Sequence, residues 1–193
     1  MPNFSNAPPE TGHGQALRLI RTPAPGKLIA ICTSPKLVGC PTHFWRMRTI
    51  PCEAPNCEAC DNGVPWRWHG YVSAVNIKSN EHFIFECTAQ AAETFTQFTE
   101  RHGSLLGCTF EATRLGDHAN GRVLLRCKPT DLTSKTLPTA PDLIGCLCHI
   151  WNVSRPEVAI DGILKQNDRL RINRLPENSN GNGKEKPATK GTR

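Results

Sequence analysis

The 193-residue chain is poor in aromatic residues and has no long hydrophobic run. Aromatic residues make up 6% of the chain and hydrophobic residues 38%. No apolar stretch approaches the length of about 18 residues that a membrane-spanning helix requires. The N-terminal sequence MPNFSNAPPETGHGQ lacks both the basic start and the apolar stretch of a secretory signal. We therefore expect an intracellular, cytoplasmic protein without a membrane segment.

Motifs of common enzyme classes are also missing. The chain contains neither a nucleophile elbow around a serine nor a glycine loop that cradles phosphates. Zinc deaminases combine His-x-Glu with Pro-Cys-x2-Cys, and Pro51-Cys52 begins like the second motif. However, four residues separate Cys52 from Cys57, and no His-x-Glu supplies the acid/base glutamate. We predict that the protein is not an enzyme, with a zinc hydrolase or deaminase as the remote alternative.

Glycine and proline, by contrast, are abundant, with 15 and 16 residues. Such a composition favours short elements joined by many turns. The C-terminal stretch PENSNGNGKEKPATKGTR has no large apolar residue and cannot bury enough surface to fold. The predicted organisation is a flexible lead-in (1–26), a core (27–128), a Pro-rich connector with apolar segments at 143–153 and 158–170 (129–175), and a disordered basic tail (176–193).

The core has the pattern of a mainly β protein with one helix. Residues 89–102 repeat apolar side chains at helical spacing, between Thr88 as an N-cap and Gly103 as a stop. Segment 122–127 alternates an apolar face with a face that carries Arg122 and Arg126, as a half-buried strand would. The predicted strands are 27–32, 42–50, 70–78, 82–87, 108–115 and 122–127, with a hairpin turn at 79–81.

One histidine and three cysteines lie within eighteen positions: His43, Cys52, Cys57 and Cys60. The cysteines read Cys-x4-Cys-x2-Cys, and sulfur and imidazole ligands at this density suit a tetrahedral zinc ion. The proline-rich loop between them has no core of its own, so a metal would hold it together. His43 is the preferred fourth ligand, and His69 and Cys40 remain alternatives.

The other cysteines have a different interpretation. Without a secretory signal, ten cysteines indicate thiols and metal ligands in a reducing compartment rather than disulfides. Four of them lie in or beside apolar stretches, where cysteine behaves as a small buried hydrophobe; these are Cys32, Cys87, Cys108 and Cys127. The tract Cys146-x-Cys148-His149 has awkward spacing for a single ion and lies in an apolar segment, so we expect it to pack in the interior.

Aromatic and cationic residues cluster around the cysteine loop. Flat rings interleaved with arginines suit stacking on unpaired bases, with charge contacts to phosphates. Net charge is +6, and residues 1–50 carry +5 while residues 51–100 carry −5, a distribution compatible with a polyanionic partner. The candidate nucleic-acid contacts are Trp45, Arg46, Arg48, Trp66, Arg67, Trp68, Tyr71, Arg122 and Arg126, with Trp66 and Trp68 expected to be exposed on a loop.

A histidine on a strand, followed by spaced cysteines, an aromatic strand and a hairpin, resembles the zinc-loop single-stranded-DNA-binding proteins of T4-type phages. The resemblance covers about residues 27–128 and implies an OB-like, partly open Greek-key barrel with an inserted zinc loop. It also implies that His43, Cys52, Cys57 and Cys60 bind zinc and that Tyr71 lies on the strand that stacks bases. The first cysteine spacing is shorter here, and the tail is basic rather than acidic.

Together these patterns predict a non-enzymatic protein that binds single-stranded DNA, or RNA, with low sequence specificity and a structural zinc ion. The alternative is a zinc-stabilised adaptor that binds another protein through Trp66, Trp68 and the 143–153 segment, because apolar surface of this kind also marks protein interfaces.

Overall fold

The computed structural model describes residues 17–133 and 136–154, which are mainly β-sheet with few helices. The strands are β1 (Arg18–Arg21), β2 (Lys27–Cys32), β3 (Val38–Trp45), β4 (Arg48–Pro51), β5 (Trp66–Asn76), β6 (His82–Thr88), β7 (Cys108–Arg114) and β8 (Val123–Pro129). The helices are α1 (Glu58–Asp61), α2 (Ala89–His102), α3 (Leu143–Trp151) and the 3-10 turn η1 (Leu115–Asp117). Within these two ranges, no helix has the length and apolar character that a bilayer crossing requires.

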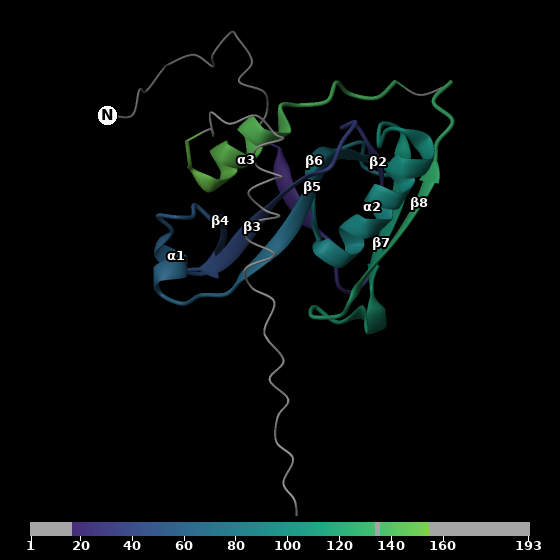
Figure 1. The fold of residues 1–193 in the computed structure, drawn as a ribbon. Coiled ribbons are helices and arrows are strands. Elements are labelled where there is room, and N and C mark those ends of the chain that lie inside the picture. The colour runs from purple at the N-terminus through teal and green to yellow at the C-terminus, as the bar shows by residue number, and fades with distance from the viewer. Residues whose placement is uncertain (1–16, 134–135, 155–193) are drawn as a thin grey trace, which may run out of the picture.

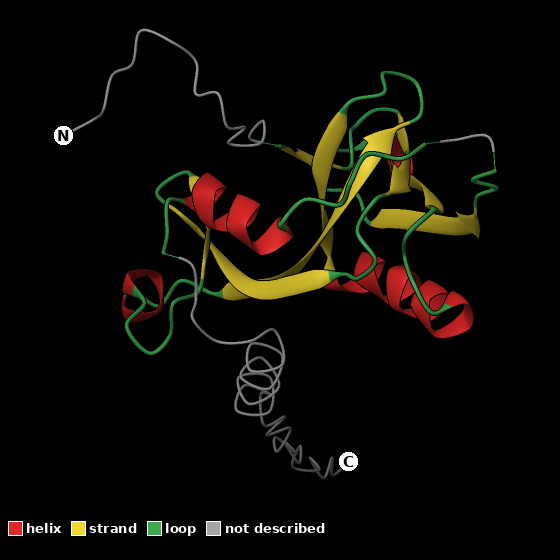
Figure 2. Ribbon diagram, turned by 90° about the horizontal axis from the view of Figure 1, so that it is seen from above, coloured by secondary structure: helices red, strands yellow, loops and turns green. Residues whose placement is uncertain are grey.

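The strands form one open sheet in the order β1-β6-β5-β2-β7-β8 (Figure 1). The long strand β5 changes partner along its length: its first half pairs with β3 and its last residues pair with β2. Strand β3 also forms a hairpin with β4. In both ribbon views this hairpin and α1 lie at one end of the molecule, away from α2 (Figures 1 and 2).

The local signals of the sequence are confirmed for most of the core. The strands predicted at 27–32, 82–87, 108–115 and 122–127 correspond to β2, β6, β7 and β8, and that predicted at 70–78 forms the second half of β5. Helix α2 begins after Thr88, whose side chain accepts a hydrogen bond from the Ala91 N–H, and ends at Gly103 in the left-handed conformation. Val123 of β8 is buried, while Arg126 of the same strand and Arg122 just before it are exposed.

Two apolar clusters cover opposite faces of β5 and β6. On one face α2 packs against the strands, where the rings of Phe85, Phe95 and Phe110 lie with centroids 4.8–6.4 Å apart. On the other face Tyr71 and Ile84 contact Leu143, Leu147 and Trp151 of α3. The apolar segment at 143–153 thus packs on the protein's own sheet; the segment at 158–170 and the tail at 176–193 lie outside the described residues.

Two elements differ from the sequence-based expectation. Segment 42–50 is not one strand but the β3–β4 hairpin, which turns at Arg46 and Met47 with φ of 48° and 64°. Sequence rules did not indicate this turn because such angles favour Asn or Gly rather than Arg or Met. In the predicted flexible lead-in, residues 18–21 form β1, because they pair in parallel with β6 and place Leu19 and Ile20 against the two apolar clusters.

Tyr71 lies beneath α3 rather than on an open base-stacking surface. Its side chain is fully buried, and its ring meets Trp151 edge-on with centroids 5.5 Å apart. The hydroxyl has no hydrogen-bond partner among the described residues. Burial, followed by the nearby Glu86 carboxylate, raises the pKa of Tyr71. The expectation that Tyr71 contacts nucleic acid therefore does not fit this fold, because α3 covers the ring.

Replacing Tyr71 with phenylalanine should raise the free energy of unfolding by about 1 kcal/mol, because it removes a buried hydroxyl without a partner and keeps the ring. Chemical denaturation measures this difference. Ile84→Val, which removes one methyl group from the same cluster, should instead lower the free energy of unfolding by about 1 kcal/mol. A destabilised Tyr71→Phe variant would show that the hydroxyl makes a favourable contact.

Candidate metal centre and adjoining groove

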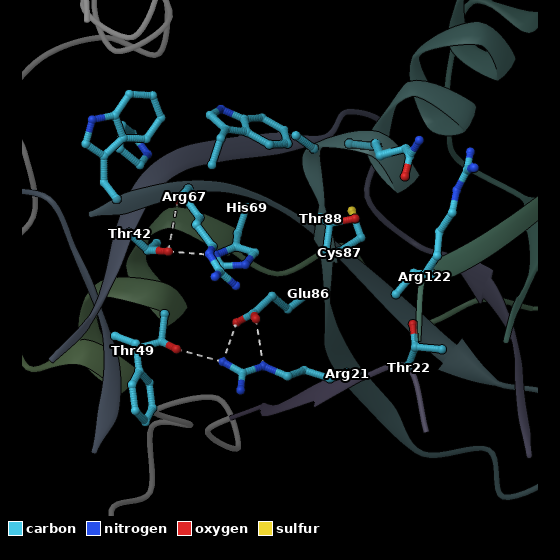
Figure 3. Close-up of a pocket in the computed structure, with 18 of the residues that line it drawn as sticks. Arg21, Thr22, Thr42, Thr49, Arg67, His69, Glu86, Cys87, Thr88 and Arg122 are labelled. Atoms are coloured by element: carbon cyan, nitrogen blue, oxygen red, sulfur yellow. Dashed lines mark hydrogen bonds and ion pairs between the residues drawn. The ribbon is translucent and has the colours of Figure 1, made fainter. Parts of the chain in front are cut away.

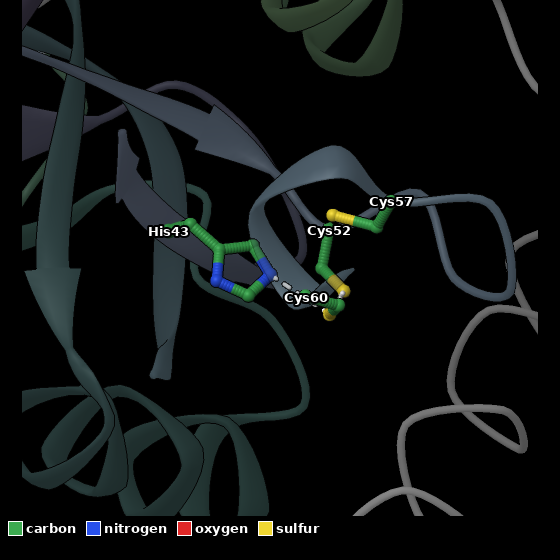
Figure 4. A group of neighbouring side chains, drawn as sticks. All are labelled: His43, Cys52, Cys57 and Cys60. Carbon is green, nitrogen blue, oxygen red and sulfur yellow. Dashed lines mark hydrogen bonds between the residues drawn. The ribbon is translucent and has the colours of Figure 1, made fainter. Parts of the chain in front are cut away.

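The four residues singled out by their spacing converge in the fold (Figure 4). Their ligand atoms, the imidazole nitrogen of His43 and the sulfurs of Cys52, Cys57 and Cys60, all lie within 4.8 Å of one another. The Cys60 sulfur is 3.5 Å from the Cys52 sulfur and 3.4 Å from His43 Nε2. A tetrahedral zinc ion with ordinary bond lengths separates its ligand atoms by about 3.5–3.8 Å, so the donor set fits such an ion.

Each ligand is positioned by a short element. His43 is buried near the end of β3, and Cys52 follows β4, where its N–H donates to the Pro41 carbonyl. Cys57 is the residue before α1, and Cys60 lies within that single turn of helix. The turn closes through a hydrogen bond from the Gly63 N–H to the Cys60 carbonyl. A β-hairpin and one helical turn therefore bring together residues that are up to 17 positions apart.

The electrostatics of the thiols favour a bound cation. Burial, together with the neighbouring thiols Cys60 and Cys57, raises the pKa of Cys52 to about 12. Burial also acts to raise the pKa of Cys57, but hydrogen bonds from the loop backbone outweigh it, and the net result is a lowered pKa. Neighbouring thiolates repel one another, and this repulsion opposes their deprotonation. A bound cation would offset the repulsion, since a thiol that coordinates a cation is deprotonated. None of the ten cysteines, all of which lie in the described part of the chain, forms a disulfide bond.

The structure distinguishes the candidates for the fourth ligand. His43 belongs to the cluster, whereas His69 Nδ1 lies 2.6 Å from the Thr42 hydroxyl. Cys40 is the cross-strand partner of His69, outside the cluster. The tract around Cys148 supplies no metal-binding group among the described residues. Cys148 is buried and Cys146 half-buried, but His149 is exposed, so the expectation that the tract packs in the interior is confirmed for Cys148 and wrong for His149. The His/Cys cluster thus has the geometry of a metal-binding site.

A groove of about 1660 Å³ adjoins this cluster (Figure 3). One wall comes from the β3–β4 hairpin, with Phe44 and Thr49, and from the first residues of β5. The other wall comes from the start of α2 and from the loop before β8, with Arg122. Four arginines and two glutamates contribute to its lining. These residues are Arg21, Arg67, Arg114, Arg122, Glu86 and Glu93. The groove is therefore basic overall.

The buried charge in the groove is paired. Glu86 is buried on β6 and accepts hydrogen bonds from Nε and Nη2 of Arg21, at 2.6 and 3.2 Å. Nη2 of Arg21 also donates to the Thr49 hydroxyl of β4, at 2.8 Å. Burial lowers the pKa of the neighbouring His69, so this imidazole is neutral at pH 7. Because Arg21 neutralises Glu86, the exposed charges of the lining are Arg67, Arg122 and Glu93, which leave the accessible surface with a net positive charge.

A second arginine connects the two ends of the open sheet. Arg114 donates from Nε to the Thr22 carbonyl, just after β1, and from Nη1 to the Gly121 carbonyl, just before β8. The distances are 3.0 and 3.1 Å. This side chain thus holds the β8 end of the groove against the β1 end.

Comparisons with protein-family models, with curated proteins and with solved structures found no match. Function must therefore be inferred from the metal cluster and the groove themselves.

The groove brings together four of the nine predicted contact residues: Trp66, Arg67, Trp68 and Arg122. The two tryptophans were expected to be exposed on a loop, but they lie on β5, where both are half-buried. Pairing with β3 extends β5 back to residue 66, into a segment whose proline and glycine content had indicated a loop.

The remaining predicted contacts do not line the groove. Arg46 lies over the ring of Trp45, 5.5 Å from its centroid, and forms an ion pair with Glu58 of α1. Arg48 and Arg126 are exposed outside the groove lining. The structure therefore gives Arg46 a role in joining the hairpin to α1, with its guanidinium over the Trp45 ring.

Sequence reasoning missed several groove residues, notably Arg21, Glu86 and Arg114. Arg21 lies in the segment that was expected to be flexible, although Leu19-Ile20 between two arginines was a signal for a short strand. Glu86 and Arg114 lie in correctly predicted strands, but Arg21 is 65 positions from Glu86 and Thr22 is 92 positions from Arg114, so no local pattern could indicate these two contacts.

Trp68 packs against two glycines that accommodate its ring. A Cβ on Gly39 would lie 1.9 Å from Trp68 Cζ2, and a Cβ on Gly70 would lie 3.0 Å from the ring. We expect Gly39→Ala to destabilise the protein by about 1–3 kcal/mol and to shift tryptophan emission, because the ring or the strand must move.

Thermal denaturation and fluorescence spectra check this prediction. Adding Trp68→Leu to Gly39→Ala should recover part of the loss, because the smaller side chain frees the space. If Gly39→Ala is as stable as wild type, the ring is not held against this glycine.

Proposed function

We propose that this protein binds single-stranded nucleic acid, DNA in preference to RNA, in the groove beside the metal cluster, and that the ion is a structural zinc. The observation that carries the proposal is the shared lining of one groove by Trp66, Trp68, Arg67 and Arg122. Half-buried rings next to exposed guanidinium groups are the combination that single strands require, stacking for the bases and charge for the phosphates.

The arrangement of strands supports an OB-like barrel as the finer description of the fold. Strands β2, β5, β6, β7 and β8 form a five-stranded Greek-key path, with α2 between the third and fourth strands. OB folds bind oligonucleotides on the face of their second and third strands and with the loops between strands 1 and 2 and between strands 4 and 5. Here the corresponding parts are β5, β6, the metal-bearing hairpin and the loop before β8, all of which line the groove.

Zinc fits the ligands as a structural rather than a catalytic ion. Three sulfurs and one imidazole fill all four positions of a tetrahedral ion and leave none for a reacting molecule. When bound, the ion would fix the end of β3, the start of the loop and α1 relative to one another. The chain's own residues would then hold Phe44 and the start of β5 at the groove wall.

A fluorescence titration with metal analysis on the same sample tests the proposal. A thymidine oligonucleotide of roughly 16 nucleotides should quench tryptophan emission at low salt, because Trp66 and Trp68 line the groove. With two arginine–phosphate contacts, from Arg67 and Arg122, log affinity should fall with log salt with a slope of about −1.4. No quenching at low salt would overturn the nucleic-acid proposal and favour the protein adaptor.

A further inference from the structure

The turn of the β3–β4 hairpin combines an unfavourable backbone with an exposed apolar side chain. Arg46 and Met47 both have positive φ, 48° and 64°, at positions where an Asn-Gly pair would fit without strain. Arg46 has a role within the fold, since it covers Trp45 and pairs with Glu58. Met47 is 87% exposed, so its side chain gains almost nothing from the folded chain.

The hairpin holds this methionine rigidly. At its base, His43 and Cys52 belong to the metal cluster, and near its tip the Arg46–Glu58 ion pair connects it to α1. The exposed Arg48 follows Met47 directly, so a cation flanks the apolar tip. Figures 1 and 2 show β3 and β4 at the end of the molecule away from α2. The tip is thus a fixed apolar projection with a positive charge beside it.

The groove leads to this projection. Thr42, Phe44 and Thr49 of the hairpin line the groove, and Phe44 is itself 62% exposed. Met47 lies between Phe44 and Thr49 in the chain, at the turn beyond the groove wall. A strand that leaves the groove at this end would therefore pass the tip. Nucleic-acid-binding proteins insert apolar side chains such as Met and Phe between stacked bases, with arginines on the phosphates.

We propose that Met47, with Arg48 beside it, stacks on the last base pair of a duplex while the adjoining single strand occupies the groove. The hairpin would make the protein a reader of single-strand–duplex junctions. This inference rests on the proposed function, because the single strand must enter the groove. We assign a nucleic acid rather than a protein as the occupant because the exposed Arg48 follows the methionine and the adjoining groove is basic.

The test compares two DNAs in anisotropy titrations: a thymidine tail alone and the same tail attached to a short duplex with 2-aminopurine in its terminal pair. Wild type should bind the tailed duplex about tenfold more tightly and raise 2-aminopurine fluorescence. Met47→Gly should bind both DNAs equally, with the affinity for the tail alone unchanged. Its thermal midpoint should not fall, because glycine adopts the positive φ without strain.

The matched control is Ile77→Ala, which removes an exposed apolar side chain that does not belong to the hairpin and should keep the junction preference. Equal affinity of wild type for both DNAs, or a preference that Met47→Gly retains, would overturn the junction proposal while leaving tail binding intact. If the tail itself is not bound, both proposals fail. A dimer that depends on Met47 in sedimentation would overturn the nucleic-acid assignment of the tip.

Discussion

Replacing Cys60 with serine is expected to abolish metal binding and to cause the largest loss of stability among the changes considered. The Cys60 sulfur lies within 3.5 Å of both the Cys52 sulfur and His43 Nε2, so it is central to the donor set. The loop around it consists of one helical turn and hydrogen-bonded turns, with only Cys57 and Ala59 buried. Because binding free energy becomes folding free energy at such a site, losing the ion removes most of what orders the loop.

We expect bound zinc to fall from about one ion per chain to below about 0.1. The free energy of unfolding should fall by several kcal/mol, which for a chain of this size lowers Tm by about 10 °C or more. Elemental analysis and thermal denaturation measure the two effects. A chelator added to wild type should reproduce the loss of stability and should leave Cys60→Ser unaffected.

The controls are the two residues that the sequence left open as fourth ligand. Cys40→Ala and His69→Gln should both retain about one ion per chain, because neither side chain belongs to the cluster. His43→Ala, in contrast, should lose the metal. Retention of a full ion by Cys60→Ser, or its loss in His69→Gln, would contradict the assigned donor set.

Truncating Trp66 to alanine is expected to weaken single-strand binding by about ten- to a hundredfold. Base stacking on an aromatic side chain contributes about 1–3 kcal/mol per base, and this ring is half-buried in the groove wall. Trp66 is a better test than Trp68, because Trp68 also packs against the core and its loss would alter the fold.

The charged contacts should respond differently from the ring. Arg67→Gln and Arg122→Gln should each weaken binding several-fold and reduce the magnitude of the salt slope by about 0.7, the value for one phosphate contact on a single strand. Trp66→Ala should leave that slope unchanged, since it removes no charge. Comparing affinities over a range of salt concentrations separates the two kinds of contact.

Trp151→Phe is the matched control for the tryptophan, because Trp151 lies on α3 against Tyr71 and outside the groove. Its affinity for a single strand should equal that of wild type. If Trp66→Ala binds as tightly as wild type, or Trp151→Phe weakens binding to the same extent, the binding surface lies elsewhere.

Local patterns in the sequence predicted features whose causes are local. Thr88 and Gly103 mark the ends of α2 because a cap and a left-handed stop act within one turn of helix. The three cysteines of the metal cluster lie within nine positions, so their spacing already restricted how they could meet. The alternation in β8 likewise follows from its own side chains, since successive residues of a strand point to opposite faces.

Long-range pairing decided the rest. The choice of His43 over His69 depends on the register of β3 with both β4 and β5, which aims one imidazole at the thiols and the other at Thr42. The position of Trp66 on a strand depends on the same register. Tyr71 is buried because a helix more than 70 positions later packs on its face of the sheet, a contact that no local pattern encodes.

By itself, the sequence determined the short elements of the core and the three cysteines of the candidate metal cluster, because these depend on neighbouring residues. Only the tertiary structure decided which histidine joins this cluster, the hairpin at Arg46 and Met47, and the groove lined by β1, β5, β6 and the loop before β8. The physical reason is the same for each: they arise from strand pairing and side-chain packing between segments that are far apart in the chain.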